Sequence, residues 1–183
     1  NSAKIIFMKN KTKDLTLIAI ATALTCVLSP LSIPIGIVPI ALTNLVLLLN
    51  TYVLGYRKAL IACLLYIIIG AVGIPVFANF SGGIGILTGP TGGYIIGYIL
   101  MVAVSGLLIE KYENRLIHII AMIIGTALCY TLGTAWFCFV MNSSLSSALA
   151  ICVIPFIPFD LIKILIVIII GPVINRRLNT AKK

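Results

Sequence analysis

Long apolar runs, separated by short polar or Gly/Pro-rich stretches, repeat along the whole chain. Runs of this length indicate membrane-spanning helices, because backbone polar groups inside a bilayer must be satisfied within the segment itself. The pattern predicts helices at 14–28, 40–54, 58–72, 92–109, 116–141 and 147–174. The helix at 40–54 is the weakest prediction, since it is short for a complete span. The alternation typical of membrane β-barrel strands does not occur in the sequence.

Charged side chains are concentrated in the flanks and turns between these runs. Of the 13 Lys and Arg residues, all except Lys163 flank the predicted helices. The flanking twelve are Lys4, Lys9, Lys11, Lys13, Arg57, Lys58, Lys111, Arg115, Arg176, Arg177, Lys182 and Lys183. Six helices place all twelve on one side, and the positive-inside rule assigns that side to the cytoplasm. The net charge of +9 therefore reflects topology rather than nucleic-acid binding.

Composition agrees with an all-α integral membrane protein, at 61% hydrophobic and 9% charged residues. We expect a single membrane domain: a bundle of six transmembrane helices at 14–174, a cytoplasmic segment at 1–13 and a basic cytoplasmic tail at 175–183. The connections at 29–39 and 73–91 then face outward. They contain no charge and are rich in Gly and Pro, so we interpret them as loops folded over the outer mouth of the bundle.

Asp160 and Lys163 are the two charged residues inside a predicted span. An ionised side chain at the centre of a membrane helix costs about 2.5–3.5 kcal/mol on insertion scales, so it normally faces a partner, a cavity or a ligand. The i, i+3 spacing puts both groups on one helix face. Pro155 and Pro158 precede them and weaken the helix there, which frees carbonyls to line a cavity. The alternative is a salt bridge that only ties helices together.

Polar and aromatic residues in the outer half extend this candidate site. Asn79 lies between Phe77 and Phe80 in the second outer connection, and its amide can donate and accept hydrogen bonds. Phe77, Phe80 and Tyr94 could wall a ring-containing ligand. Asn79 could equally be a turn residue, and each aromatic residue could serve ordinary packing.

The sequence lacks the motifs that several kinds of catalysis require. There is no phosphate-binding loop of the G-x-x-x-x-G-K-[ST] type and no metal-ligand motif. His118 is interpreted as an interfacial residue, Glu110 and Glu113 as a solvated patch, and the five cysteines as packing residues. Two other functions stay open on these residues alone: a small membrane enzyme that acts on a lipid, with Asp160 as base and Lys163 as phosphate binder, and a structural or channel subunit.

Three stretches carry a resemblance to a known family. They are IPIGIVPI at 33–40, YIIIGAVGIPVFANFSGGIGILTGPTGGYIIGY at 66–98 and PFDLIK at 158–163. With their G-x-P-V-F-[AS], G-P-T-x-G-Y and D-x-x-K elements, they resemble the BioY family, the biotin-specific S components of energy-coupling factor (ECF) transporters. The resemblance runs from about residue 15 to residue 174.

This resemblance implies a six-helix S-component fold that captures biotin from outside. The partners that it implies are a transmembrane coupling protein and two ATPase subunits, in a bacterial cell membrane, with no cofactor of the chain's own. An S component for another small vitamin is the alternative. Carried over, Asn79, Asp160 and Lys163 match the family's polar binding elements. The segment VPIALTN departs from the expected Thr/Gln-containing pattern, so Asn44 is left out of the site.

The resemblance also concerns the first helix. Ala19 and Ala23 form a small-x-x-x-small pair, a spacing that lets two membrane helices approach closely. In related S components an A-x-x-x-A face on this helix docks onto the membrane partner. The alternative is packing within the bundle.

Overall fold

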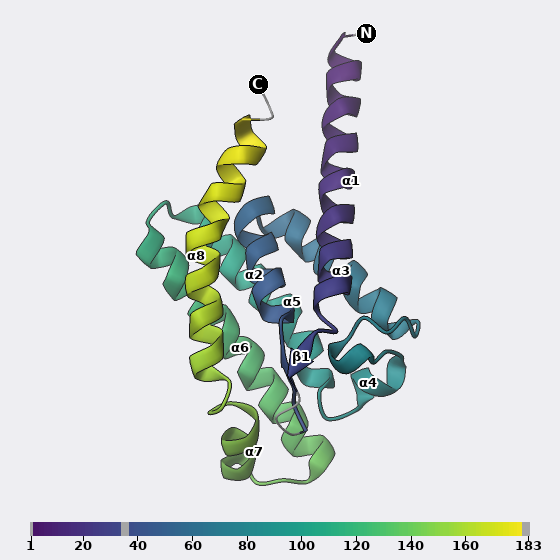
Figure 1. The fold of residues 1–183 in the computed structure, drawn as a ribbon, viewed down its shortest axis with the longest axis vertical. Coiled ribbons are helices and arrows are strands. Elements are labelled where there is room, and N and C mark those ends of the chain that lie inside the picture. Colours follow the sequence, from purple (N-terminus) through teal and green to yellow (C-terminus); the bar gives the residue numbers. More distant parts are fainter. Residues whose placement is uncertain (1, 34–36, 181–183) are drawn as a thin grey trace.

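The computed structural model describes residues 2–33 and 37–180 (Figure 1). Lys182 and Lys183 of the predicted tail, and 34–36 of the first outer connection, lie outside the described residues. Helices dominate the fold. The long ones are α1 (Ser2–Leu28), α2 (Thr43–Leu54), α3 (Tyr56–Ala71), α5 (Gly92–Lys111), α6 (Arg115–Met141) and α8 (Ile157–Thr180). Shorter elements are β1 (Ser32–Ile33), β2 (Ile40–Ala41), η1 (Ala78–Phe80), α4 (Ile84–Thr88) and α7 (Leu145–Cys152).

The boundaries of the helices follow from local chemistry. Asn114 caps α6, where its side chain accepts a hydrogen bond of 2.9 Å from the Leu116 N–H. Asn142 ends the same helix in the left-handed conformation, with φ of 48°. Gly55, with φ of 78°, separates α2 from α3 at a backbone angle that other residues rarely adopt.

The long helices pack side by side into one bundle. α5 packs against α6 and α3, α2 packs against α8, and α1 packs against α3 and α2. Large residues fill the space between them, including Leu47, Met101, Met122 and Val167. Figure 1 shows both chain ends and the α5–α6 connection at one end of the bundle, with α7 at the other.

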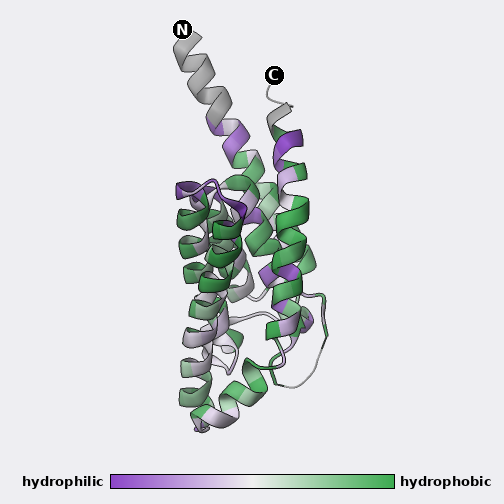
Figure 2. Cartoon of the chain, turned by 90° about the vertical axis from the view of Figure 1, so that its left-hand side faces the viewer, coloured by the Kyte–Doolittle hydropathy of each residue, from purple (hydrophilic) through white to green (hydrophobic). Residues whose placement is uncertain are grey.

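Hydrophilic segments gather at the end that carries the termini, as Figure 2 shows in purple. Polar contacts also join elements there. Lys58 of α3 pairs with Asp14 of α1, and Glu110 of α5 accepts a hydrogen bond of 2.8 Å from the Tyr56 N–H. Among the described helices, Gly92–Lys111, Arg115–Met141 and Ile157–Leu178 are long and apolar enough to cross a membrane. These helices support the prediction of an integral membrane protein.

The single helix predicted at 147–174 is wrong in its first part. The structure has α7 up to Cys152, a turn at 153–156, and α8 from Ile157. Pro155 has no N–H to donate and disfavours helix in the residue before it, which explains the break. Pro158 lies at the second position of α8, where a missing N–H costs little. Asp160 therefore sits in the first turn of a helix rather than in the middle of one.

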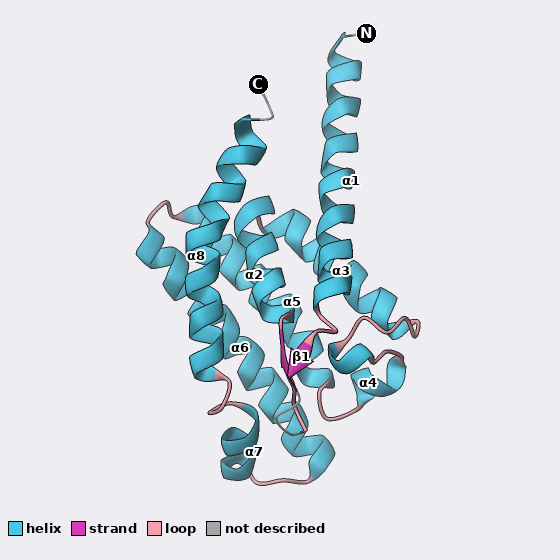
Figure 3. Cartoon of the chain, in the orientation of Figure 1, coloured by secondary structure: helices cyan, strands magenta, loops and turns pink. Residues whose placement is uncertain are grey.

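Other boundaries also differ from the sequence prediction, and α8 continues to Thr180 beyond the predicted end at 174. α1 extends over 2–13 as a helix. α2 begins at Thr43, because Ile40 and Ala41 instead pair as a strand with Ile33 and Ser32, the two strands drawn in magenta below α2 in Figure 3. Over their described residues, the first outer connection thus contains a short strand, β1, and the second contains two short helices, η1 and α4.

Candidate functional site

The predicted charge pair is buried and formed in the structure. Asp160 is 5% exposed and Lys163 is 7% exposed. The Lys163 Nζ atom lies 2.8 Å from Asp160 Oδ1, as the i, i+3 spacing predicts. It also donates a hydrogen bond of 2.8 Å to the carbonyl oxygen of Ala41 on β2. Lys163 therefore links α8 to β2, the strand that directly follows the first outer connection.

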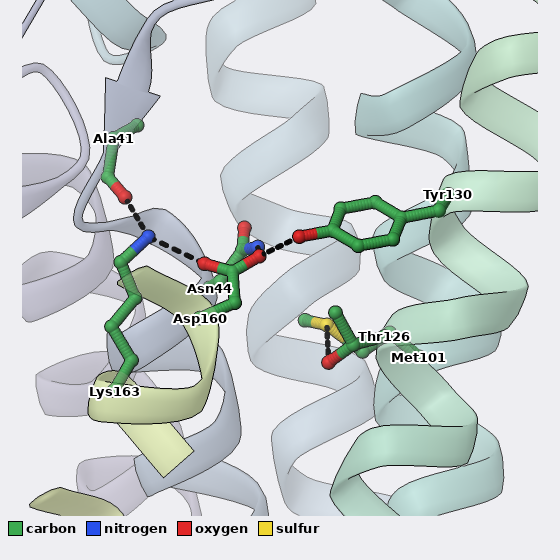
Figure 4. Close-up of polar contacts among 7 residues, drawn as sticks. All are labelled: Ala41, Asn44, Met101, Thr126, Tyr130, Asp160 and Lys163. Atoms are coloured by element: carbon green, nitrogen blue, oxygen red, sulfur yellow. Dashed lines mark hydrogen bonds and ion pairs between the residues drawn. The ribbon is translucent and has the colours of Figure 1, made fainter. Parts of the chain in front are cut away.

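Two further donors, from other helices, reach the same carboxylate (Figure 4). Asn44, in the first turn of α2, donates from Nδ2 to Asp160 Oδ2 over 3.0 Å. The Tyr130 hydroxyl on α6 donates to the same oxygen. Hydrogen bonds and an opposite charge stabilise the ionised carboxylate away from water. Asp160 thus joins three helices, α2, α6 and α8, at one point.

Asn44 was left out of the site in the sequence prediction, yet the structure puts it in contact with Asp160. Tyr130 was not considered from the sequence. One weak signal existed for each: Asn44 is a polar residue near the start of a largely apolar run, and Tyr130 lies in mid-span. Neither signal says which way the side chain points, since that depends on how each helix is rotated in the bundle.

A small cavity opens beside this charged centre. This inner cavity, of about 40 Å³, is bounded by the charged pair and its partners together with apolar and aromatic residues. Tyr94 and Tyr98 of α5 line it, and they also line a larger cavity of about 240 Å³. We call the larger one the outer cavity. The two share a wall that consists of Val38, Pro39, Ala41, Tyr94 and Tyr98.

The outer cavity has a mixed lining. Apolar groups come from Phe77, Ile86 and Ile95, and hydroxyl groups come from residues such as Thr43 and Thr91. Together the two cavities offer a charged inner end and a largely apolar outer part. This arrangement resembles small-molecule sites in general, where a few convergent polar groups orient a ligand in an apolar cleft.

Asn79 lies on the wall of the outer cavity and holds the two outer connections together. Its main-chain N–H donates to Ser32 Oγ over 2.9 Å, and Ser32 Oγ donates to Asn79 Oδ1 over 2.8 Å. The residue adopts φ of 58°, a conformation that Asn tolerates better than most residues. The structure brings Asn79 to the outer cavity but not to the inner one, and Asn79 also lines, together with Lys163, a more open cavity of about 510 Å³.

The three predicted aromatic residues have different positions. Phe77 is buried, lines the outer cavity, and meets the edge of Tyr66 at 5.5 Å between ring centroids. Tyr94 lines both cavities, and its hydroxyl lies 3.1 Å from Thr134 Oγ1. Phe80 is 66% exposed and lines the open cavity of about 510 Å³ that also contains Asn79, Phe159 and Lys163. Phe80 therefore does not share a cavity with Phe77.

The alanine pair on α1 faces away from the bundle. Ala19 and Ala23 are exposed, whereas Ala21 between them is 3% exposed and packs inside. A small, smooth strip of helix surface therefore remains uncovered by this chain. This observation goes against packing within the bundle as the role of the pair.

The other titratable residues lie elsewhere. His118 is buried near the start of α6, with Nε2 2.6 Å from the Tyr112 carbonyl oxygen and the ring edge-on to Tyr52. Over the described part of the chain, no group of three or more His, Cys, Asp and Glu residues is placed to hold a metal ion. The charged pair and its two cavities are thus the arrangement best suited to a ligand.

Comparison with known proteins gives matches over nearly the whole chain. The family model described as the BioY family matches residues 3–180. The chain is 41% identical over 155 residues to the biotin transporter BioY of Thermotoga maritima, covering 83% of this chain and 89% of that protein. It is 40% identical over 175 residues to the biotin transporter BioY2 of Lactococcus lactis subsp. cremoris, covering 94% and 96% respectively.

A solved structure matches the fold as well. The crystal structure of the S-component for biotin from an ECF-type ABC transporter superposes with a TM-score of 0.83 at 30% identity, covering 94% of this chain and 93% of that one. The residues that the family model matches, 3–180, include the segments that hold the charged pair and both cavities.

Proposed function

Because the chain belongs to the BioY family, we propose that it is the biotin-binding S component of a vitamin uptake transporter. It is a substrate-binding subunit rather than an enzyme. It captures biotin from outside, and an ECF module carries the vitamin inward. We place it in a bacterial cell membrane, as a protein that crosses the bilayer six times.

The hydrogen-bonding capacity left at the charged pair is the observation that carries this proposal. A carboxylate offers about four acceptor positions, and Lys163, Asn44 and Tyr130 use three at Asp160. An ammonium has three donors, and Lys163 directs two of them to Asp160 and Ala41. One acceptor position and one donor therefore remain for a ligand.

Biotin has groups that match the remaining acceptor position of Asp160 and the remaining donor of Lys163. Its ureido ring presents N–H donors beside a carbonyl acceptor, so Asp160 accepts from a ring N–H while Lys163 donates to the carbonyl or to the valerate carboxylate. The fused ring and aliphatic tail extend into the outer cavity, between Phe77 and Tyr94. Asn79 closes this cavity and donates to the end of the ligand away from Asp160. At about 240 Å³, the outer cavity suits a compact ligand.

Energy for transport comes from partner subunits in this proposal. The sequence has no phosphate-binding loop, and ATP is used by two ATPases that act through a transmembrane coupling protein. The chain itself needs no cofactor. Ala19 and Ala23, exposed on α1, form the surface that meets the coupling protein.

Mass spectrometry of the ligand that copurifies with the protein tests the function directly. The protein is purified in detergent from cells supplied with a mixture of vitamins, and the bound small molecules are extracted. We expect biotin at close to one molecule per chain. Another vitamin at that ratio, or turnover of a lipid by the isolated protein, would contradict the proposal.

Cysteine labelling tests the topology on a variant without the five native cysteines. A cysteine at Gly85, where an added Cβ meets nothing within 4 Å, is expected to react from outside intact cells. Gly82 is less suitable, because a Cβ there meets the backbone of Ile74. A cysteine at Glu113 is expected to react only after permeabilisation. The reverse pattern would overturn the orientation, which rests on the distribution of basic residues.

A further inference from the structure

A basic cavity lies between α6 and α8, at the end of the bundle that carries the termini. It has a volume of about 330 Å³ and is lined by Arg115, Ile168, Ile169, Pro172, Val173 and Arg176. It is separate from the charged pair and its two cavities, with which it shares no lining residue. We propose that it binds an anionic phospholipid, with the phosphate between Arg115 and Arg176 and the acyl chains along α8.

The charge of the cavity favours an anion. Two guanidinium groups line it, and none of the four acidic residues of the chain does. Arginine is well suited to phosphate because its planar fork donates two parallel hydrogen bonds. Arg115 is also the first residue of α6, where the helix dipole adds positive potential.

The remaining lining favours a lipid over a free phosphate. All four of the other residues are apolar, and Ile169 and Val173 are 70% and 52% exposed. Exposed aliphatic residues continue along α8 at Leu165 and Ile162, so they provide an apolar surface for acyl chains. Pro172 also removes the N–H that would bond the Ile168 carbonyl, which leaves an acceptor for a headgroup hydroxyl.

The position of the cavity favours a lipid over a protein partner. α1 carries the exposed alanine strip and packs on α2 and α3, whereas α8 packs on α2 and α6. Figure 1 shows α1 and α8 on opposite sides of α2. The basic cavity therefore lies away from the strip that we assign to the coupling protein. Basic cavities between membrane helices near the cytoplasmic surface are known to hold anionic headgroups.

Native mass spectrometry of the detergent-purified chain tests the proposal. Phosphatidylglycerol is added to wild type and to the variant Arg115→Gln/Arg176→Gln, with phosphatidylcholine as the zwitterionic comparison. We expect the wild type to retain one phosphatidylglycerol in preference to phosphatidylcholine, and the double variant to bind it about 10- to 30-fold more weakly. Arg177→Gln is the matched control, because Arg177 is exposed on the same turn but does not line the cavity.

Biotin binding by the double variant is expected to stay normal, which shows that the chain is folded. Four results would overturn the proposal. They are unchanged lipid retention in the double variant, an equal loss in Arg177→Gln, displacement of the lipid by millimolar inorganic phosphate, and loss of ECF-module binding with lipid retention intact. The third indicates a site for free anions, and the fourth indicates a protein interface.

Discussion

Asp160→Asn and Lys163→Met are each expected to remove most of the affinity for biotin, by about 2–5 kcal/mol. Each change takes away a ligand contact and also leaves a buried group without its opposite charge. The measurement is a biotin titration of the purified protein by calorimetry. If both single variants bind like the wild type, the pair is only structural and the site is elsewhere.

The two variants are not expected to be equally stable. After Lys163→Met, the carboxylate keeps its hydrogen bonds from Asn44 and Tyr130. After Asp160→Asn, the ammonium keeps the Ala41 carbonyl as its main-chain partner but no counter-charge. We therefore expect a lower thermal midpoint for Asp160→Asn than for Lys163→Met. The double variant should be more stable than either, because no unpaired ion is then buried.

Tyr130→Phe provides a graded comparison. It removes one hydrogen bond to Asp160 and leaves the charge pair intact, so the expected loss of affinity is only about 1 kcal/mol. A loss as large as that of Asp160→Asn would show that Tyr130 itself contacts the ligand.

Ala19→Trp and Ala23→Trp are expected to abolish biotin uptake while leaving biotin binding by the isolated chain nearly unchanged. Both alanines are exposed and lie away from the cavities. A tryptophan there fills the strip along which a second membrane helix would approach. The measurements are copurification with an ECF module, ATP-driven uptake in vesicles and a biotin titration.

Leu24→Trp is the matched control, since Leu24 is 48% exposed on the adjacent face of the same helix. It is expected to assemble and transport normally. Normal assembly of both alanine variants would show that the partner docks elsewhere. Loss of biotin binding in them would mean that the bundle needs these positions for its own packing.

The positions of the helices, and pairs of residues close together in one helix, could be predicted from the sequence. The apolar runs located most ends of the long helices to within a few residues. Helix periodicity alone put Asp160 beside Lys163, and the structure has them 2.8 Å apart. The motifs at 66–98 and 158–163 were sufficient to identify the family, which the comparisons confirm. The break at 153–156 was missed because the prolines were interpreted as weakening a helix rather than ending one.

Contacts between residues of different segments could not be predicted from the sequence. Asn44 and Asp160 are 116 residues apart, and their contact depends on the rotation of α2 and α8 about their own axes. Phe77 and Phe80 are close in sequence, yet they line different cavities, because the chain turns through left-handed conformations at Asn79 and Phe80.

The sequence by itself determined that this is a helical membrane protein of the BioY family with one buried charge pair. It could do so because helix formation, bilayer insertion and i, i+3 neighbours depend on local spacing. Only the tertiary structure decided that Asn44 and Tyr130 complete the carboxylate site, that Asn79 lines the outer cavity, and that Arg115 and Arg176 line one cavity between α6 and α8. These groups meet through the packing of separate helices, and the sequence pattern of one helix does not specify how its neighbours are turned.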